Sequence, residues 1–261
     1  MKAMVLAAGL GTRLRPLTDD RPKALVEVAG RTMLEITLTR LRSFGVYDVI
    51  VNVHHFADLV LRYLKKNDNF GMRIVVSEEP VLLDTGGGLK KAAYFLADHS
   101  DHPSDPFILH NVDVISTIDL RRMVQFHTES GALATLAVQK RETSRYLLFD
   151  RQLRLCGRQA GRDEKPELVR FSSETQVSSG PQAPPELQAL AFSGIHVLSL
   201  RLLDRITEEG AFSIITSYLR LAGEGEKIVA FRTDDYYWRD LGKPENVAQA
   251  TRDLKEKVLV Q

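Results

Sequence analysis

The first half of the chain alternates short apolar runs with stretches of helical periodicity. Runs without polar alternation, such as 49–53, predict strands that are buried on both faces. Between these runs the apolar residues recur at helical spacing, and Gly45 stands where the first helix would end. This alternation favours a mostly parallel sheet covered by helices on both faces. The pattern predicts strands at 4–8, 49–53, 73–77, 107–110 and 133–138, and helices at 32–44, 56–66, 88–97 and 120–129.

The pattern changes after residue 138. Residues 157–186 are rich in Gly, Pro, Gln, Ser and charged residues, and they predict a long, lid-like polar excursion within one domain of residues 1–261. Pro244 is typical of the first position of a C-terminal helix. The remaining predicted elements are a hairpin of 146–149 with 153–156, strands at 190–197, 228–232 and 236–241, and a helix at 214–222.

Composition excludes several classes of protein. Lysine and arginine total 35 against 34 aspartates and glutamates, so bulk charge gives no support for binding to nucleic acid or to a membrane surface. Cys156 is the sole cysteine, which excludes an intrachain disulfide and predicts a buried, unreactive thiol. No apolar run approaches the roughly 18 residues of a membrane span, and the apolar N-terminal stretch is too short for a secretory signal. We therefore expect a cytoplasmic protein, of an oligomeric state that the sequence does not reveal.

The first predicted strand runs directly into a glycine loop. Gly9 and Gly11 allow a tight turn in which backbone N–H groups approach a phosphate. A Rossmann fingerprint beginning at Gly9 would need glycine where Leu14 stands, and no P-loop Gly-Lys-Ser/Thr follows. Arg13 and Lys23 are cations of the kind that a polyphosphate site needs, although arginine and lysine are also the usual solvated surface residues.

The residues 7–18 (AAGLGTRLRPLT) together with 22–26 (PKALV) resemble the signature of the sugar-1-phosphate nucleotidyltransferases. One departure is Glu27, where many members have proline. The resemblance implies that the glycine loop cradles a nucleoside triphosphate, and that Arg13 and Lys23 act catalytically by neutralising charge on the reacting phosphates. The nucleotide-binding residues it implies are Leu6, Ala7, Ala8, Gly9, Gly11, Thr12, Arg13, Lys23, Gly87 and Asn111.

Two aspartates are candidate metal ligands. Asp113 follows the predicted strand 107–110, at the edge of an open α/β sheet where ligands collect. A single aspartate in such a place is commonly a turn or cap residue. However, the stretch 111–113 (NVD) resembles the family's N/G-x-D element, and 238–242 (WRDLG) resembles its W-x-D-hydrophobic-G element. The resemblance implies that Asp113 and Asp240 bind Mg²⁺, which prefers a few carboxylates with water and phosphate oxygens.

Further motifs point to the base and to the sugar. Three glycines, 86–88, ahead of a predicted helix suit close approach of a flat or anionic ligand, or a flexible connection. The stretch resembles the family's base-contacting turn and implies a contact from Gly87. Ser193 and Gly194 lie in a stretch similar to the family's sugar-facing F-S/A-G-I element. Lys165 matches a sugar-phosphate-binding E-K-P element but lacks the apolar strand that precedes it in the family.

The resemblance implies a doubly wound, Rossmann-like three-layer α/β fold with a mixed, mostly parallel central sheet. The implied reaction joins a nucleoside monophosphate to a sugar 1-phosphate and releases pyrophosphate. Among family members the motifs look closest to N-acetylmuramate 1-phosphate uridylyltransferases, with mannose-1-phosphate guanylyltransferases as near rivals. A choline-phosphate cytidylyltransferase would need an aromatic cage, for which 236–238 (YYW) is the only hint. A non-catalytic nucleotide sensor of the same fold is expected to have lost at least one of Arg13, Lys23, Asp113 and Asp240.

Overall fold

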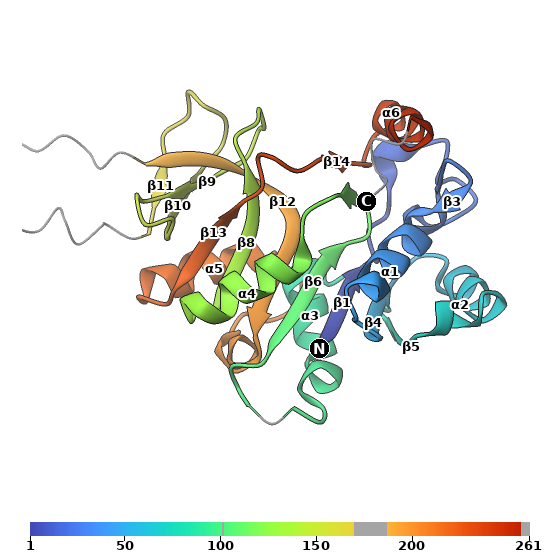
Figure 1. Cartoon of the computed structure of the whole chain (residues 1–261), viewed down its shortest axis with the longest axis horizontal. Helices are drawn as coiled ribbons and strands as arrows, with labels where there is room; N and C mark the ends of the chain where they lie inside the picture. The colour runs from blue at the N-terminus through green and yellow to red at the C-terminus, as the bar shows by residue number, and fades with distance from the viewer. Residues whose placement is uncertain (101, 170–186, 257–261) are drawn as a thin grey trace, which may run out of the picture.

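The computed structural model describes residues 1–100, 102–169 and 187–256. Ten of the strands described form a mixed sheet at the centre of the molecule (Figure 1), and the others form two separate two-stranded sheets. Most of the ten follow one another across the mixed sheet in the order β11 (Glu167–Leu168), β10 (Leu155–Gln159), β9 (Tyr146–Phe149), β12 (Gln188–Ser199), β6 (Pro106–Asn111), β1 (Lys2–Leu6), β4 (Asp48–Val53) and β5 (Arg73–Glu78). The long strand β12 also pairs with β8 (Ala134–Gln139), which in turn pairs with β13 (Ile228–Arg232).

The centre of the sheet is mostly parallel. Strands β6, β1, β4 and β5 run in one direction, and β12 runs antiparallel to β6. Because β8 is antiparallel to β12 and β13 is parallel to β8, both return to the direction of β6. The predicted mostly parallel, mixed sheet is therefore confirmed.

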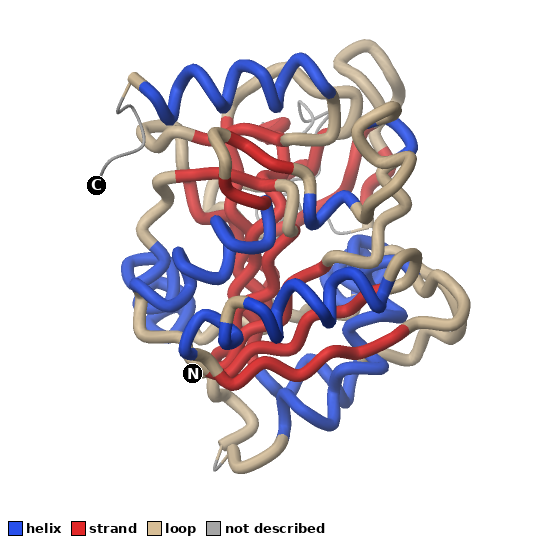
Figure 2. Tube along the Cα trace, turned by 90° about the vertical axis from the view of Figure 1, so that its right-hand side faces the viewer, coloured by secondary structure: helices blue, strands red, loops and turns tan. Residues whose placement is uncertain are grey.

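Helices cover both faces of the sheet, as the sequence predicted. Along β1, Ala3 and Val5 pack into one apolar core and Met4 into another, as the alternation of a strand requires. The first core takes the apolar faces of α1 (Met33–Ser43), α2 (Ala57–Lys66), α4 (Leu120–Ser130) and α6 (Pro244–Lys255). The second takes those of α3 (Asp84–Ala97) and α5 (Ile214–Gly223), and Figure 2 shows the strands between the helices.

The structure corrects the prediction for residues 84–97. The helix predicted at 88–97 begins at Asp84, so the three glycines lie inside α3 and are buried. A Cβ on Gly86 would lie 2.2 Å from the ring of Phe212, and one on Gly87 would lie 2.4 Å from the backbone oxygen of Gly210. These glycines are therefore required by the packing of α3 against the segment before α5, a requirement that the sequence alone did not indicate.

The polar excursion predicted at 157–186 is partly structured. Its first residues continue β10, and Glu167–Leu168 form β11, which pairs with β10. The rest of the predicted excursion, 170–186, lies outside the described residues. Short elements that the sequence did not reveal include β2 (Glu27–Val28), β3 (Arg31–Thr32) and β7 (Val114–Ser116). Strand β7 pairs with β14 (Trp238–Asp240), and this pairing shapes the candidate site.

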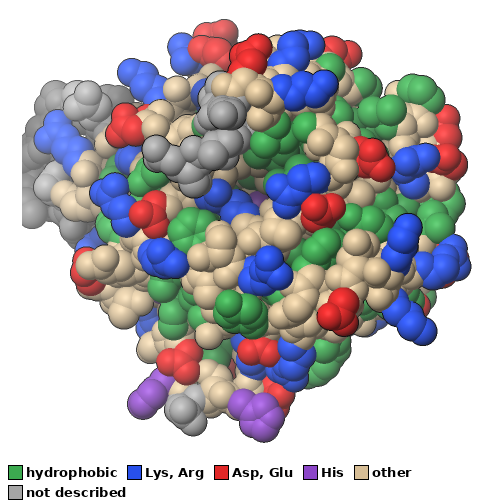
Figure 3. Space-filling model, turned by 45° about the vertical axis from the view of Figure 1, so that its right-hand side comes forward, with side chains coloured by type: hydrophobic (Ala, Val, Ile, Leu, Met, Phe, Trp, Pro, Cys, Tyr) green, Lys and Arg blue, Asp and Glu red, His purple; other side chains and the backbone are tan. Residues whose placement is uncertain are grey.

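The surface and the core agree with the composition. Acidic and basic side chains are interspersed over the face shown in Figure 3, in keeping with the small net charge. Cys156 is buried, as predicted. Among the described residues, the helices are all too short or too polar to cross a membrane.

Buried histidines make the fold sensitive to acid. Among the described residues, burial lowers the pKa of His110 and of His127 to about 4, and that of His196 to about 3. These side chains stay neutral in the folded state, whereas in the unfolded chain they take up a proton below about pH 6.5. Stability is therefore full above that pH and is lost as the pH falls towards 4, because the unfolded state binds more protons there.

We expect the free energy of unfolding to decrease between pH 7 and pH 5, by up to about 1.4 kcal/mol per pH unit for each such histidine. Urea denaturation at several pH values measures this slope. His127→Gln is expected to make the slope shallower, whereas His102→Gln, at an exposed position, should leave it unchanged. A free energy of unfolding that is constant from pH 7 to pH 5 would contradict the prediction.

Candidate active site

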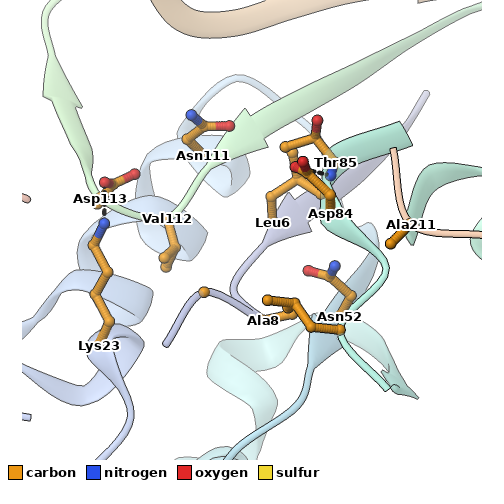
Figure 4. A pocket seen from close by; sticks show the side chains of 12 residues that line it. Leu6, Ala8, Lys23, Asn52, Asp84, Thr85, Asn111, Val112, Asp113 and Ala211 are labelled. Atoms are coloured by element: carbon orange, nitrogen blue, oxygen red, sulfur yellow. Dashed lines mark hydrogen bonds and ion pairs between the residues drawn. The ribbon is translucent and has the colours of Figure 1, made fainter. Parts of the chain in front are cut away.

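A cavity of about 570 Å³ opens at the carboxyl ends of β1, β4 and β6 (Figure 4). Its volume is in the range of small-molecule sites, and its place is where ligands of open α/β sheets bind. The residues that line it are Leu6, Ala8, Gly9, Lys23, Asn52, Leu82, Asp84, Thr85, Asn111, Val112, Asp113 and Ala211. Six of these were predicted as site residues from the sequence: Leu6, Ala8, Gly9, Lys23, Asn111 and Asp113.

The glycine loop begins where β1 ends and is held at both ends. At its start, the backbone N–H of Ala7 donates a hydrogen bond to Oδ1 of Asn52 at 2.7 Å. At its far end, Gly11 has a φ of 65°, and the hydroxyl of Thr18 donates to its carbonyl oxygen at 2.9 Å. A Cβ on Gly11 would lie 2.9 Å from Cγ2 of Thr18, so glycine is needed there both for the backbone angle and for the space.

A short turn of 3-10 helix carries Arg13 from this loop towards the acidic residues. The helix η1 (Thr12–Leu14) is anchored by the fully buried Leu14, which leaves Thr12 and Arg13 exposed. A Cβ placed on Gly242 would lie 2.8 Å from Nη2 of Arg13 and 2.8 Å from Oδ1 of Asp240. The guanidinium and the carboxylate therefore approach the same point in space, and the glycine after Asp240 leaves room for both.

The two predicted metal ligands lie at a pair of neighbouring strands. Asp113 precedes β7 and Asp240 ends β14, and in this antiparallel pair Asp240 stands opposite Val114. The backbone N–H of Leu241 donates to the carbonyl oxygen of Asp113 at 2.8 Å, which fixes the two segments at this point. Lys23, in η2 (Lys23–Leu25), forms an ion pair with Oδ2 of Asp113 (Figure 4). The structure thus brings Arg13, Lys23, Asp113 and Asp240 together, although they are far apart in sequence.

The paired acids suit a divalent cation. Burial, and after it the charge of Asp113, raise the pKa of Asp240, while Lys23 and Arg13 oppose this rise. A cation between the two carboxylates would relieve their repulsion. Among the described residues there is no cluster of three or more His, Cys, Asp or Glu side chains that would enclose a metal. Two carboxylates are enough for Mg²⁺, which takes its other ligands from water and phosphate, so the residues present fit this ion.

Asn111 lines the cavity next to the segment predicted to face the sugar. Its Oδ1 is buried and has no hydrogen-bond partner among the described residues, so it can accept a hydrogen bond from a ligand hydroxyl or N–H. A Cβ on Gly194, whose φ is 74°, would lie 3.0 Å from Nδ2 of Asn111. Ser193 is fully buried, and its carbonyl oxygen accepts a hydrogen bond from Nε1 of Trp238 at 2.7 Å.

Other predicted residues lie away from the cavity lining. Eight predicted site residues do not line the cavity: Ala7, Gly11, Thr12, Arg13, Gly87, Ser193, Gly194 and Asp240. Gly87 is packed against Gly210, so its contact with a base stays a prediction. Lys165 is exposed. The aromatic residues 236–238 do not form an open cage, because the guanidinium of Arg141 already covers the ring of Trp238.

Asn52 is a site residue that sequence reasoning missed. It is a polar side chain inside the apolar run of β4, and this interruption was the signal that could have revealed it. Its Nδ2 donates to Oε1 of the buried Glu79 at 2.7 Å, and Oε2 of Glu79 accepts from the backbone N–H of Leu83 at 3.0 Å. Asn52 therefore links the glycine loop on one side of the cavity to the start of α3 on the other.

We expect Asn52→Ala to destabilise the fold by about 1–3 kcal/mol, because it leaves the N–H of Ala7 and one oxygen of the buried Glu79 without a partner. Urea denaturation checks the change. Asn67→Ala is the matched control: its amide donates to Tyr63 at the end of α2, and we expect less than half the effect. Equal losses for the two variants would show that the link across the cavity has no special role.

Comparison with known proteins agrees with this geometry. Residues 2–257 match the family model described as nucleotidyl transferase. The N-acetylmuramate alpha-1-phosphate uridylyltransferase of Caulobacter vibrioides is 34% identical over 263 residues, covering 97% of each chain. The mannose-1-phosphate guanylyltransferase catalytic subunit beta of Xenopus tropicalis is 31% identical over 94% of this chain, but the chain spans only 62% of that relative.

Solved structures extend the comparison to the fold. The crystal structure of HddC from Yersinia pseudotuberculosis complexed with GMP-PN superposes with a TM-score of 0.71 at 20% identity, covering 97% of this chain and 99% of that chain. At this identity the likeness concerns the fold alone, and it confirms the Rossmann-like architecture expected from the sequence. With the family model spanning nearly the whole sequence, the chain belongs to the nucleotidyl transferase family.

Proposed function

We propose that this chain transfers a nucleoside monophosphate unit from a nucleoside triphosphate to a sugar 1-phosphate and releases pyrophosphate. The observation that carries the proposal is the meeting of Arg13 and Lys23 with Asp113 and Asp240 beside the cavity, which Lys23 and Asp113 line. The triphosphate and the sugar phosphate bring roughly six negative charges together, and a site for them must set fixed cations against that charge.

The chemistry requires neutralisation and positioning more than proton transfer. The phosphate oxygen of the sugar is ionised at neutral pH, so no general base is needed to produce the nucleophile. Arg13 and Lys23 are placed to offset the charge that builds up at the α-phosphate and on the departing pyrophosphate. The backbone of the glycine loop, held by Asn52 and Thr18, aligns the triphosphate for in-line attack.

We infer that Mg²⁺ is the cofactor, held by Asp113 and Asp240. When bound, the ion supplies Lewis-acid stabilisation of phosphate charge. The ion pair of Lys23 with Asp113 keeps the ammonium group beside that position, so that the lysine can exchange its partner for a phosphate oxygen when substrate arrives.

Within this class, we propose that the chain acts in the cytoplasm and that its substrates are UTP and N-acetylmuramate 1-phosphate. Support comes from the N-acetylmuramate alpha-1-phosphate uridylyltransferase of Caulobacter vibrioides, which the chain matches along nearly the full length of both proteins. A guanylyltransferase acting on mannose 1-phosphate is the second candidate, supported by relatives of similar identity. A choline-phosphate cytidylyltransferase has less support, because Arg141 covers the ring of Trp238 that a cage would need.

A panel of the four nucleoside triphosphates against N-acetylmuramate, mannose and glucose 1-phosphates and choline phosphate tests the proposal. Pyrophosphate release is the measurement, with and without Mg²⁺. We expect the largest kcat/KM for UTP with N-acetylmuramate 1-phosphate, and no release in the presence of EDTA. Nucleotide binding without pyrophosphate release from any pair would instead identify a nucleotide sensor and overturn the enzymatic proposal.

Asp240→Asn is expected to separate activity from stability. The substitution removes the repulsion between two half-enclosed carboxylates and keeps an oxygen that can accept from the N–H of Gly242, so Tm should equal or slightly exceed that of the wild type. Turnover should fall at least about 100-fold, because one of the two proposed metal ligands is lost. Asp235→Asn, at an exposed position, should change neither quantity. Near-normal turnover of Asp240→Asn would remove this residue from the proposed mechanism.

A further inference from the structure

One guanidinium beside the acidic pair has no part in the mechanism so far. The Cζ of Arg141 lies 3.8 Å from the ring centroid of Trp238, and its Nη2 donates to the carbonyl oxygen of Phe192 at 2.6 Å. Trp238 in turn donates to the carbonyl oxygen of Ser193, the next residue of the same strand. Arg141 and Trp238 are thus fixed to each other and to two consecutive carbonyls of β12, at the irregularity in its pairing with β8 between Phe192 and His196.

This guanidinium has no anionic partner in the part of the chain that the structure describes. Arg141 is half-buried and its Nε is fully buried without a hydrogen bond, yet none of the carboxylates in the described ranges forms an ion pair with it. Arg220 and Arg239, which are also part-buried, pair with Glu208 and Asp253. Arg40 and Arg201 resemble Arg141, because each has a buried Nε without a hydrogen bond and donates to a backbone carbonyl, but Arg141 differs from them in lying beside Asp240. Burial lowers the pKa of Arg141, an effect that the charge of Asp240 opposes. A cation held away from water without a counter-ion is costly, unless a ligand supplies the anion.

The position of Arg141 favours the acceptor over the nucleotide. Arg141 follows β8 and does not line the cavity between the glycine loop and α3. It contacts instead the segment of Phe192 and Ser193, next to Gly194, where a Cβ would lie 3.0 Å from Nδ2 of Asn111. Trp238 stands two residues before Asp240 on β14, and Arg141, stacked on Trp238, lies close enough to Asp240 for the charge of that carboxylate to act on its pKa.

We propose that Arg141, held flat against Trp238, binds an oxyanion of the acceptor sugar phosphate. The inference rests on the proposed function, which supplies such an acceptor. The oxyanion has two sources, the 1-phosphate that every acceptor carries or a carboxylate on the sugar, which N-acetylmuramate has and N-acetylglucosamine lacks. A guanidinium pairs with either group through two parallel N–H donors, and the aromatic ring fixes the plane of the fork.

Steady-state kinetics of Arg141→Gln with N-acetylmuramate 1-phosphate and with N-acetylglucosamine 1-phosphate as acceptors test the inference. We expect the KM for the acceptor to rise about 10- to 100-fold, the loss of one charge-assisted pair, while the KM for the nucleoside triphosphate stays unchanged. A rise for N-acetylmuramate 1-phosphate alone identifies the carboxylate, and an equal rise for both acceptors identifies the 1-phosphate. Arg141→Lys should recover part of the affinity. Arg122→Gln is the control, since Arg122 is exposed and its guanidinium donates only to the hydroxyl of Tyr236 among the described residues.

Three outcomes would overturn the inference: an unchanged acceptor KM, a rise confined to the nucleotide KM, or a fall in Tm with both KM values unaltered. The test is separable from the proposed function. If the wild type turns over no acceptor, the enzymatic proposal fails, and calorimetric binding of the two sugar phosphates to the wild type and to Arg141→Gln still decides the role of Arg141. Equal binding to both proteins, or none to either, would then refute it.

Discussion

The structure of the site depends on offsetting the repulsion between two partly buried carboxylates that lie close together. Asp240 ends β14 and Asp113 immediately precedes its partner β7, and the mutual repulsion of the two carboxylates works against the pairing that brings them together. Lys23 offsets this repulsion through its ion pair with Asp113, and Arg13 approaches Asp240 from the glycine loop. The same two cations are those that a polyphosphate needs. The charges that offset the repulsion between the carboxylates are therefore also the charges that we propose to bind substrate.

Hydrogen bonds to the backbone hold the segments of Asp113 and Asp240 in place. The N–H of Leu241 is bonded to the carbonyl of Asp113, and the side chain of Asn246, in the first turn of α6, is bonded to the carbonyl of Asp240. The short strand β14 is thus held by β7 and the residue before it on one side and by the C-terminal helix on the other. Because the contact of Leu241 with Asp113 joins residues more than a hundred positions apart, the acidic pair forms only when these two parts of the chain have folded together.

Local pattern was enough to predict most elements and the cationic side of the site. Apolar runs such as 49–53 and the glycine loop after β1 carry their information within a few residues, and the family motifs placed Asp113 and Asp240. The glycines at 86–88 were misplaced because their role is tertiary: they make room for Phe212 and for the backbone of Gly210. Asn52 was missed because its partners, Ala7 and Glu79, are identified only by the register of β1 beside β4 and by the return of the chain after β5.

Two proposed binding sites adjoin the acidic pair, and they are held in place differently. At the proposed nucleotide site, the glycine loop and the start of α3 are held in place by buried side chains such as Asn52. At the proposed acceptor site, Trp238 and Arg141 are anchored on the carbonyls of β12. Because β14 carries both Trp238 and Asp240, a change that shifts the proposed acceptor contact also shifts a proposed metal ligand. On these two proposals, acceptor choice and turnover are coupled through the three-residue strand β14, whereas the glycine loop and η1 approach the acidic pair without passing through that strand.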